Sequence, residues 1–457
     1  MSASDRSDCN EFSDDGARKL PPTARYSRRG FLELSAAGAA TAGMGAYVTL
    51  GASRPSDAAT PSSAEKEELV DQATPARYFV RRENGSYEMK WGPVGAAAVS
   101  DDPSLRYGDT IPNDRSYIHN RAKPPAIDVK TWRLRLTGDA LTRPRSFTYA
   151  ELSAMPQVTL RRTLDCGANC ASFFPKLPPS VADHQWLPEG FTQWHFGAVT
   201  AAEWTGVRVK DVLAAAGAHG AVEVKFIGLD EISSPGDPGG TVHYSQVVRA
   251  EEALKDDTLL VYRMNGTALS ADHGYPVRVL FSGWGGNHMV KWLGEIQASK
   301  RSIPITGPAK NQVLVGPDYP TPVRPTVAPV RSAVEHDPER TLMPGNHTLY
   351  GRAWSGTGSI DRVDVTVEQL LRPQTWTTVI PWREAKLLST PEPLMWVRFA
   401  LPWQNVRPGY YRIMTRAKDT AGNIQPRPED VVWNQHGLGY NGHHPLELIV
   451  LPTGDMP

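Results

Sequence analysis

Cysteine is scarce in this chain of 457 residues, which contains Cys9, Cys166 and Cys170 and no other cysteine. The spacing excludes the C-x-x-C of a redox pair, the C-x-x-C-H of an attached haem and the four ligands of a structural zinc site. Cys166 and Cys170 stand four residues apart in the stretch TLDCGANC (163–170), after a run with the pattern of a strand. Spacing alone leaves open a buried free thiol and a Cys166–Cys170 disulfide.

Net charge is also missing, because 49 Lys and Arg residues balance 49 Asp and Glu residues. No net field attracts nucleic acid or an anionic membrane, so we expect no nucleic-acid partner, and any anion must be bound by a local cluster. The length predicts two or three domains, each large enough for its own core.

A long apolar run is absent from the N-terminus as well. Arg28 and Arg29 stand in an S-R-R-x-F-L context before a short stretch of Ala and Gly that ends in GAS at Ser53. This is the pattern of a twin-arginine signal, which is recognised by an export machinery. We therefore expect residues 1–53 to be a cleaved signal peptide and the mature protein to be periplasmic or otherwise extracytoplasmic. An uncleaved membrane anchor is the alternative.

The composition of residues 54–95 predicts a linker, and the mixture of strand-like and helix-like segments in residues 96–317 predicts an α+β domain. In the latter, TWRLRLTGD alternates apolar and basic residues as a strand does, and QVTLRRTL predicts a strand that ends at Cys166. Thr148 and Glu151 have capping-box spacing at the start of a short helix. VKDVLAAAG places its apolar residues on one helical face, and its glycine ends that helix.

Residues 318–457 have a different sequence pattern. RVDVTVE, LYGRAW, MWVRFAL, GYYRIMTRAKD and LELIV predict short strands, separated by turns such as SGTGS and DTAGN. Several short strands with few helices favour a β-sandwich of the immunoglobulin type. The proline-rich YPTPVRPTVAP predicts the boundary with the preceding domain.

Four segments carry a wider pattern: NDRSYIHNR (113–121), TLDCGANC (163–170), FGAVTAAEWTGVRVKDVL (196–213) and LLVYRMNGTALSADHGYPVRVLFSGWGGNHMVKWLGEI (259–296). In this order they resemble the sulfite oxidase family of molybdopterin enzymes. GRAWSGTGSIDRVDV, RAKDTAGNIQP and WNQHGLGYNG resemble the immunoglobulin-like dimerisation domain of that family. The resemblance covers residues 100–452 and implies a molybdopterin-binding domain, a dimerisation domain and a homodimer.

The resemblance also implies roles for individual residues. Cys166 matches the thiolate that ligates molybdenum, and a thiolate is the soft donor that such a metal needs. The strand end before a glycine turn predicts that its sulfur lies at an exposed rim. The remaining matches are to residues that bind the molybdenum–molybdopterin cofactor, whose phosphate calls for cationic and N–H donors: Asn120, Asp230, His273, Arg278 and Lys291.

The chain departs from the family where sulfite is bound. His119 replaces one family arginine, and Cys170 and Ala171 occupy the positions of two others. We therefore expect His119 to act at the reacting centre, as a cation at mildly acidic pH, and Arg121 and Cys170 to lie in the substrate pocket. The active-site tyrosine of the family has no clear counterpart.

We therefore predict an exported molybdenum oxidoreductase that oxidises sulfite or a related small sulfur compound by oxo transfer. Because the chain has no C-x-x-C-H, an external cytochrome or other haem protein would accept the electrons. The absence of family arginines keeps a reductase of neutral sulfoxides or N-oxides as an alternative. A cofactor-free exported scaffold is a third hypothesis.

Overall fold

The structure, a computed structural model, describes residues 79–81, 87–89, 109–174, 196–233, 240–335, 341–372, 375–443 and 445–452. All of them belong to one compact unit, Ser62–Pro457. The expected signal peptide (1–53) lies outside the described residues. In the expected linker, β1 (Phe79–Arg81) pairs antiparallel with β2 (Tyr87–Met89).

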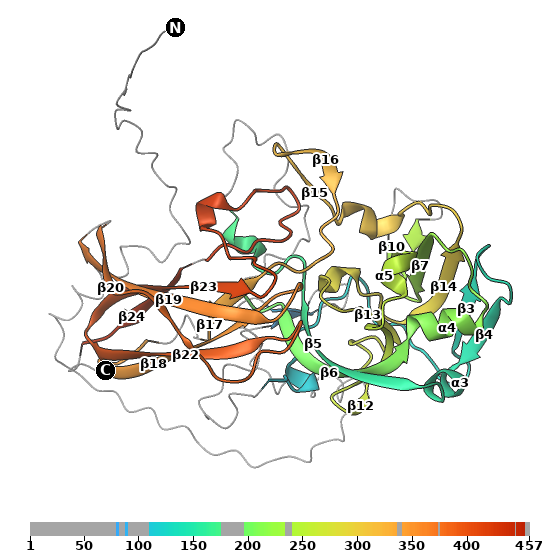
Figure 1. The fold of residues 1–457 in the computed structure, drawn as a ribbon, viewed down its shortest axis with the longest axis horizontal. Helices are drawn as coiled ribbons and strands as arrows, with labels where there is room; N and C mark the ends of the chain where they lie inside the picture. The colour runs from blue at the N-terminus through green and yellow to red at the C-terminus, as the bar shows by residue number, and fades with distance from the viewer. Residues whose placement is uncertain are drawn as a thin grey trace, which may run out of the picture. The chain divides into compact units, whose positions relative to one another are not determined.

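Two sheets, one mixed and one antiparallel, form the first part of this unit (Figure 1). One has the order β10 (Ser245–Arg249), β7 (Glu223–Gly228), β14 (Leu293–Ser299), β3 (Arg133–Thr137) and β4 (Arg145–Thr148). The other has the order β12 (Thr267–Ala268), β11 (Thr258–Met264), β6 (Val199–Arg208) and β5 (Gln157–Asp165), and β13 (Arg278–Phe281) also pairs with β11. A single apolar core joins the two sheets.

Three short α-helices accompany these sheets: α3 (Tyr149–Ser153), α4 (Val209–Ala215) and α5 (Ala250–Ala253). The predicted capping box at α3 is confirmed, because the Glu151 N–H donates to Thr148 Oγ1 at 3.0 Å and the Thr148 N–H donates to the Glu151 carboxylate at 2.8 Å. The helix predicted from VKDVLAAAG is confirmed as α4. It buries three aliphatic side chains and ends before Gly217, whose φ of 67° suits a residue without Cβ.

The second part is a sandwich of two four-stranded sheets (Figure 1). One has the order β17 (Arg331–Val334), β18 (Gly345–Trp354), β22 (Val397–Val406) and β21 (Lys386–Leu387). The other has the order β20 (Thr375–Glu384), β19 (Ile360–Arg372), β23 (Gly409–Asp419) and β24 (Leu446–Val450). Inward-facing side chains of both sheets form one apolar core. The predicted order, an α+β part followed by a β-sandwich, is confirmed.

Short hairpins and 3₁₀ turns complete the described fold. The hairpins are β8 (Ile232–Ser233) with β9 (Thr241–Val242), and β15 (Leu314–Gly316) with β16 (Tyr319–Val323). The 3₁₀ turns are η4 (Asn113–Arg115), η5 (Ala171–Phe173), η7 (Gly286–His288), η8 (Gly307–Asn311) and η9 (Pro428–Asp430). The boundary expected after residue 317 falls at the tip of the β15–β16 hairpin.

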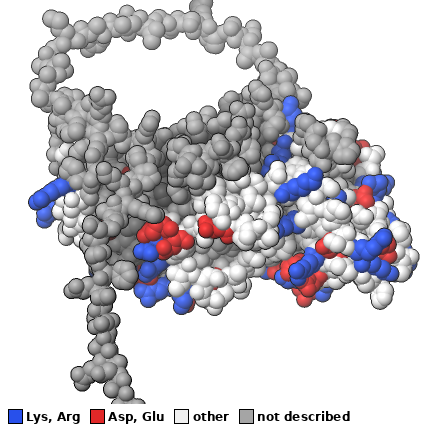
Figure 2. All heavy atoms as spheres, turned by 90° about the horizontal axis from the view of Figure 1, so that it is seen from above, with Lys and Arg blue, Asp and Glu red and all other residues white. Residues whose placement is uncertain are grey.

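The surface reflects the balanced composition. On the face seen in Figure 2, basic and acidic side chains lie beside one another. Among the described residues, no helix has the length and apolar character needed to cross a membrane.

Candidate functional site

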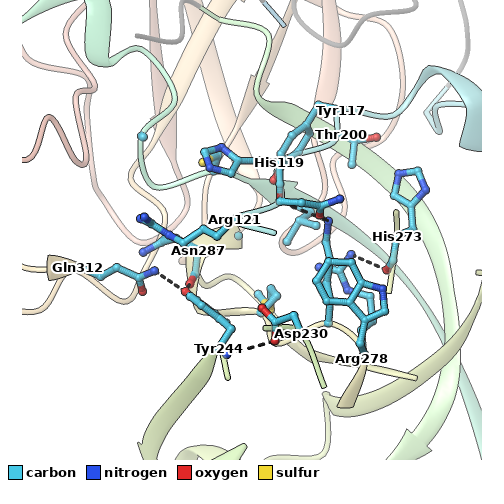
Figure 3. Close-up of a pocket in the computed structure, with 18 of the residues that line it drawn as sticks. Tyr117, His119, Arg121, Thr200, Asp230, Tyr244, His273, Arg278, Asn287 and Gln312 are labelled. Atoms are coloured by element: carbon cyan, nitrogen blue, oxygen red, sulfur yellow. Dashed lines mark hydrogen bonds between the residues drawn. The ribbon is translucent and has the colours of Figure 1, made fainter. Parts of the chain in front are cut away.

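A cavity of about 120 Å³ opens where β5, β6 and β13 meet the loops before β3, after β7 and after β13 (Figure 3). Its lining is Tyr117, His119, Asn120, Arg121, Leu164, Cys166, Ala168, Thr200, Trp204, Asp230, Tyr244, His273, Arg278, Gly286, Asn287, Met289, Lys291, Trp292, Asn311, Gln312 and Leu438. Every site residue expected from the sequence lies here except Cys170. Segments far apart in the chain therefore converge on one cavity.

Cys166 follows the last residue of β5, as predicted, and its backbone N–H donates to the Ala198 carbonyl at 2.9 Å. The turn after it is tight, since a Cβ on Gly167 would lie 2.3 Å from Asn287 Oδ1. The expectation of an exposed rim is wrong, because the side chains around the cavity leave Cys166 only 6% exposed. Burial raises the pKa of its thiol to about 11, so the proton stays on the sulfur at neutral pH in the absence of a metal.

Cys170 lies outside this cavity. Its backbone adopts the left-handed conformation, with φ 68°, and its side chain is buried in a cluster with Phe174 and Tyr440. Both Cys166 and Cys170 are free thiols, so the disulfide left open by the spacing is not formed. Cys166 and Cys170 stand at the two ends of the turn between β5 and η5, and their side chains lie in different surroundings.

Two basic side chains, the buried Arg278 and the half-buried Lys291, lie in the cavity. Burial lowers the pKa of Arg278 to about 10, and burial together with the charge of Arg278 lowers the pKa of Lys291 to about 7. Arg278 donates to the His273 carbonyl at 3.2 Å, and its guanidinium lies 5.3 Å from the centre of the Trp204 ring. An anionic ligand in this cavity would favour the charged form of both groups, chiefly that of Lys291.

Unsatisfied polar atoms indicate that this cavity is built for a ligand. His273 Nε2 and Arg278 Nε are buried with no hydrogen-bond partner among the described residues. The other ring nitrogen of His273 is held by the Ser270 hydroxyl at 2.8 Å, which leaves Nε2 for another partner. Burial lowers the pKa of His273 to about 3, so the ring is neutral. Buried polar atoms are costly without partners, and a bound polar group would supply them.

The segment before β3 brings His119 and Arg121 to the cavity (Figure 3), and Asn120 also lines it. Lys291 holds this segment in place by hydrogen bonds. Its ammonium donates to Asn120 Oδ1 and, at 3.4 Å, to the His119 carbonyl oxygen. Arg121 lines the same cavity as Cys166, and its positive charge opposes the rise in the pKa of that thiol.

Asp230 lies at the end of the loop after β7. Its carboxylate accepts the Tyr244 N–H at 3.1 Å, and burial raises its pKa. The residue is 2% exposed, and the positive charge of Lys291 opposes that rise. Asp230 therefore helps to place the loop that carries Tyr244 and is a polar group of the cavity wall.

Sequence reasoning missed several polar residues of the wall, chiefly Tyr117, Tyr244, Asn287 and Gln312. The Tyr244 hydroxyl donates to the Asn287 carbonyl and accepts a hydrogen bond from the side chain of Gln312 (Figure 3). Tyr244 and Gln312 stand in loops whose sequence has no motif, so only the folded chain reveals their place. Tyr117 lies in NDRSYIHNR (113–121), but nothing in the neighbouring residues indicates that it lines the cavity.

The donors of the cavity fit a metal that is held largely by a non-protein ligand. No group of three or more His, Cys, Asp or Glu side chains is arranged to hold a metal ion within the described ranges. Cys166 supplies one soft donor, while Arg278, Lys291 and His273 suit an anionic organic group. The Tyr117 hydroxyl lies close to the backbone of Gly286. A Cβ at this position would lie 2.6 Å from that hydroxyl, so the cavity wall has no room for a side chain here.

Comparisons with known proteins agree with this arrangement. Residues 121–305 match the family model of the oxidoreductase molybdopterin binding domain, and residues 326–450 match that of the Mo-co oxidoreductase dimerisation domain. Sulfite oxidase of Gallus gallus is 32% identical over 347 residues, which cover 72% of this chain and 70% of that protein. Nitrate reductase [NADH] 1 of Phaseolus vulgaris is 28% identical over 370 residues, which cover 73% of this chain and 39% of that protein.

A solved structure has the same fold. The sulfane dehydrogenase SoxCD from Paracoccus pantotrophus superposes with a TM-score of 0.62 at 20% identity, covering 87% of this chain and 92% of that chain.

Proposed function

We propose, because the chain belongs to the sulfite oxidase family of molybdopterin-dependent oxidoreductases, that it oxidises sulfite or a related small sulfur compound and passes the electrons to an external haem protein. The observation that carries the proposal is the shared cavity of the Cys166 thiol and three cationic side chains, Arg121, Arg278 and Lys291. A thiol alone or a basic cluster alone would be unremarkable; together they match a metal-bearing anionic cofactor and an anionic substrate.

The molybdenum–molybdopterin cofactor would supply an oxygen atom to the substrate sulfur and take up two electrons. Cys166 would hold the metal through its sulfur, and the thiol proton must leave when the metal binds because the thiolate is the ligand. Arg278, Lys291 and the free Nε2 of His273 would bind the anionic and polar edges of the cofactor. Asn120 and Asp230 would complete this set on the cavity wall.

Arg121 is the residue that we assign to the substrate. It lines the cavity beside Cys166, and guanidinium groups bind oxyanions through two parallel N–H donors. His119 is its neighbour in the wall and would add a second cation at mildly acidic pH. Cys170, which the sequence suggested for this pocket, is not assigned a role there because its side chain lies in the aromatic cluster.

A reductase of neutral sulfoxides or N-oxides is the second candidate. It is favoured by the neutral groups at the positions of two family arginines, Cys170 and Ala171, and by a wall rich in uncharged donors such as Tyr244 and Gln312. A relative that is named nitrate reductase supports reduction within the family. The family matches argue against a cofactor-free scaffold.

A substrate panel on the purified holoenzyme tests the direction and the substrate. Sulfite and thiosulfate would be offered with an oxidised haem protein, and sulfoxides with a reduced dye. We expect turnover of sulfite or thiosulfate with the haem acceptor and bound molybdenum and pterin in the wild type. Turnover confined to the sulfoxide arm would replace the first proposal by the second, and protein without molybdenum from a cofactor-competent host would refute both.

Export and assembly complete the proposal. We infer a twin-arginine signal at Arg28–Arg29 and a periplasmic location. Replacing both arginines by lysine should leave folded, cofactor-loaded protein in the cytoplasm, since the pair is recognised as an address. We also propose that the sandwich is an immunoglobulin-like domain through which two copies associate, supported by its match to a dimerisation model. Light scattering that shows a monomer at micromolar concentration would exclude this assembly.

A further inference from the structure

The residue before Cys166, Asp165, is held from the sandwich rather than from its own domain. Its carboxylate is 2% exposed and forms an ion pair with Arg331 of β17, which is 1% exposed. Trp354 of β18 donates its indole N–H to the same carboxylate oxygen at 3.0 Å. A buried carboxylate without partners would be very unfavourable, so these two side chains are what allow Asp165 to lie here.

Arg331 also contacts the other end of the turn that presents Cys166. Its guanidinium donates to the Asn169 carbonyl at 3.3 Å and to the Tyr440 carbonyl at 2.7 Å. The Asn169 side chain in turn donates to the second oxygen of Asp165 at 2.9 Å, which closes the turn on itself. One buried guanidinium therefore connects both ends of the turn with the C-terminal part of the chain.

A backbone contact strengthens this connection. The N–H of Gly439, the residue before Tyr440, donates to the carbonyl of Gly167 at 2.8 Å. Gly167 is the residue directly after Cys166, so contacts from the C-terminal part flank the cysteine on both sides. Burying an ion pair contributes little net stability but selects one geometry, which suits a turn that must present a metal ligand.

We propose that Arg331 and Trp354 are positioning residues for Cys166, so that the C-terminal sandwich completes the metal-binding turn of the preceding domain. This inference rests on the proposed role of Cys166 as the molybdenum ligand. It implies that loss of the Arg331 and Trp354 hydrogen bonds to the turn loosens the metal site without altering any cavity residue.

The test uses the full chain without cofactor, in which the position of the thiol can be measured independently of metal. Cys166 would be alkylated with iodoacetamide at fixed pH, and fragmentation of peptide 163–176 would separate it from Cys170. Arg331→Lys keeps the positive charge but loses the planar set of guanidinium N–H donors. Trp354→Phe keeps an aromatic ring but loses the indole N–H donor. Arg352→Lys is the matched control, since this buried arginine of β18 pairs with Glu335, away from the cysteine turn.

We expect alkylation of Cys166 to be about tenfold faster in Arg331→Lys and about threefold faster in Trp354→Phe, because lost hydrogen bonds raise the open population of the turn. The control should stay within about twofold of the wild type. Rates equal to the wild type in both test variants, or an equal increase in Arg352→Lys, would overturn the proposal. If Arg331→Lys does not fold, Trp354→Phe decides.

Molybdenum content and the visible absorption of the loaded proteins give a second measurement. Arg331→Lys should retain several-fold less metal and shift the thiolate-to-metal band, with a larger change in kcat than in KM. Wild-type protein without molybdenum would refute the proposed function, whereas the alkylation rates would still decide the positioning role. Full metal retention with an unshifted band in both test variants would refute the positioning role alone.

Discussion

Lys291 is half-buried, but its ammonium lies in a desolvated part of the cavity wall, and this predicts an unusual dependence of stability on pH. Burial lowers the pKa of its ammonium from 10.5 to about 7 in the protein without ligand. The ammonium donates to Asn120 Oδ1 and to the carbonyls of Asp272 and His119, at 2.6 Å and 3.4 Å for the carbonyls. The titratable groups that act on its pKa are Arg278, which lowers it, and Asp272, Asp230 and Cys166, which raise it.

The sign follows from proton binding. The folded-state pKa of Lys291 lies below the unfolded value, so the unfolded chain holds more protons between about pH 7 and 10.5. Stability from this group therefore rises with pH across that window. For a single group with these pKa values, the free energy of unfolding should be about 2 kcal/mol higher at about pH 9 than at about pH 7.

Denaturant unfolding of cofactor-free protein at these two pH values would measure this effect, with tryptophan fluorescence as the signal. Lys291→Met removes the titrating group and keeps the apolar stem, so the gain between the two pH values should shrink by about 2 kcal/mol relative to the wild type. Lys300→Met, at an exposed lysine after β14, is the control and should behave like the wild type. An identical gain in wild type and Lys291→Met would refute the claim that this ammonium is desolvated.

Three further outcomes are expected. Cys166→Ser should lower bound molybdenum at least about tenfold, because a hydroxyl is a poor donor to a soft metal, whereas Cys170→Ser should keep it; metal analysis would show this, and equal retention would contradict the ligand assignment. Thr148→Ala should lower stability by about 1 kcal/mol in urea unfolding and leave KM unchanged, since it removes the capping box of α3. Arg121→Gln should raise KM for sulfite by about tenfold or more and leave that for a neutral sulfoxide nearly unchanged, in proportion to one lost charge-assisted bond; equal effects on both would place Arg121 away from the substrate.

Local patterns in the sequence were sufficient for much of the fold. The capping box at Thr148 and Glu151, the helix that ends before Gly217 and the strand that ends at Cys166 all appear as predicted. These features depend on neighbours within a few residues, through caps, side-chain periodicity and turn preferences, so a single sequence contains them. The order of segments along the chain was likewise enough to identify the family.

The candidate site was determined from the sequence only as a set of residues. The convergence of His119, Arg121, Cys166 and Lys291 on one cavity required strands and loops from across the domain to pack together. Tyr244 and Gln312 line the cavity although no sequence motif indicates it. Because contacts between distant segments depend on packing of the whole core, periodicity could not reveal them.

Burial and orientation were decided by the tertiary structure alone. The sequence placed both Cys166 and Cys170 at the site, yet Cys166 lines the cavity whereas Cys170, itself in the left-handed conformation, packs among aromatic rings. Arg331 and Trp354 stand in a different part of the chain from Asp165 and meet it only after the sandwich has packed against the first domain. The sequence by itself determined which chemical groups are available, whereas desolvation and long-range pairing, which exist only in the folded chain, decided which of them face the cavity and how each is charged.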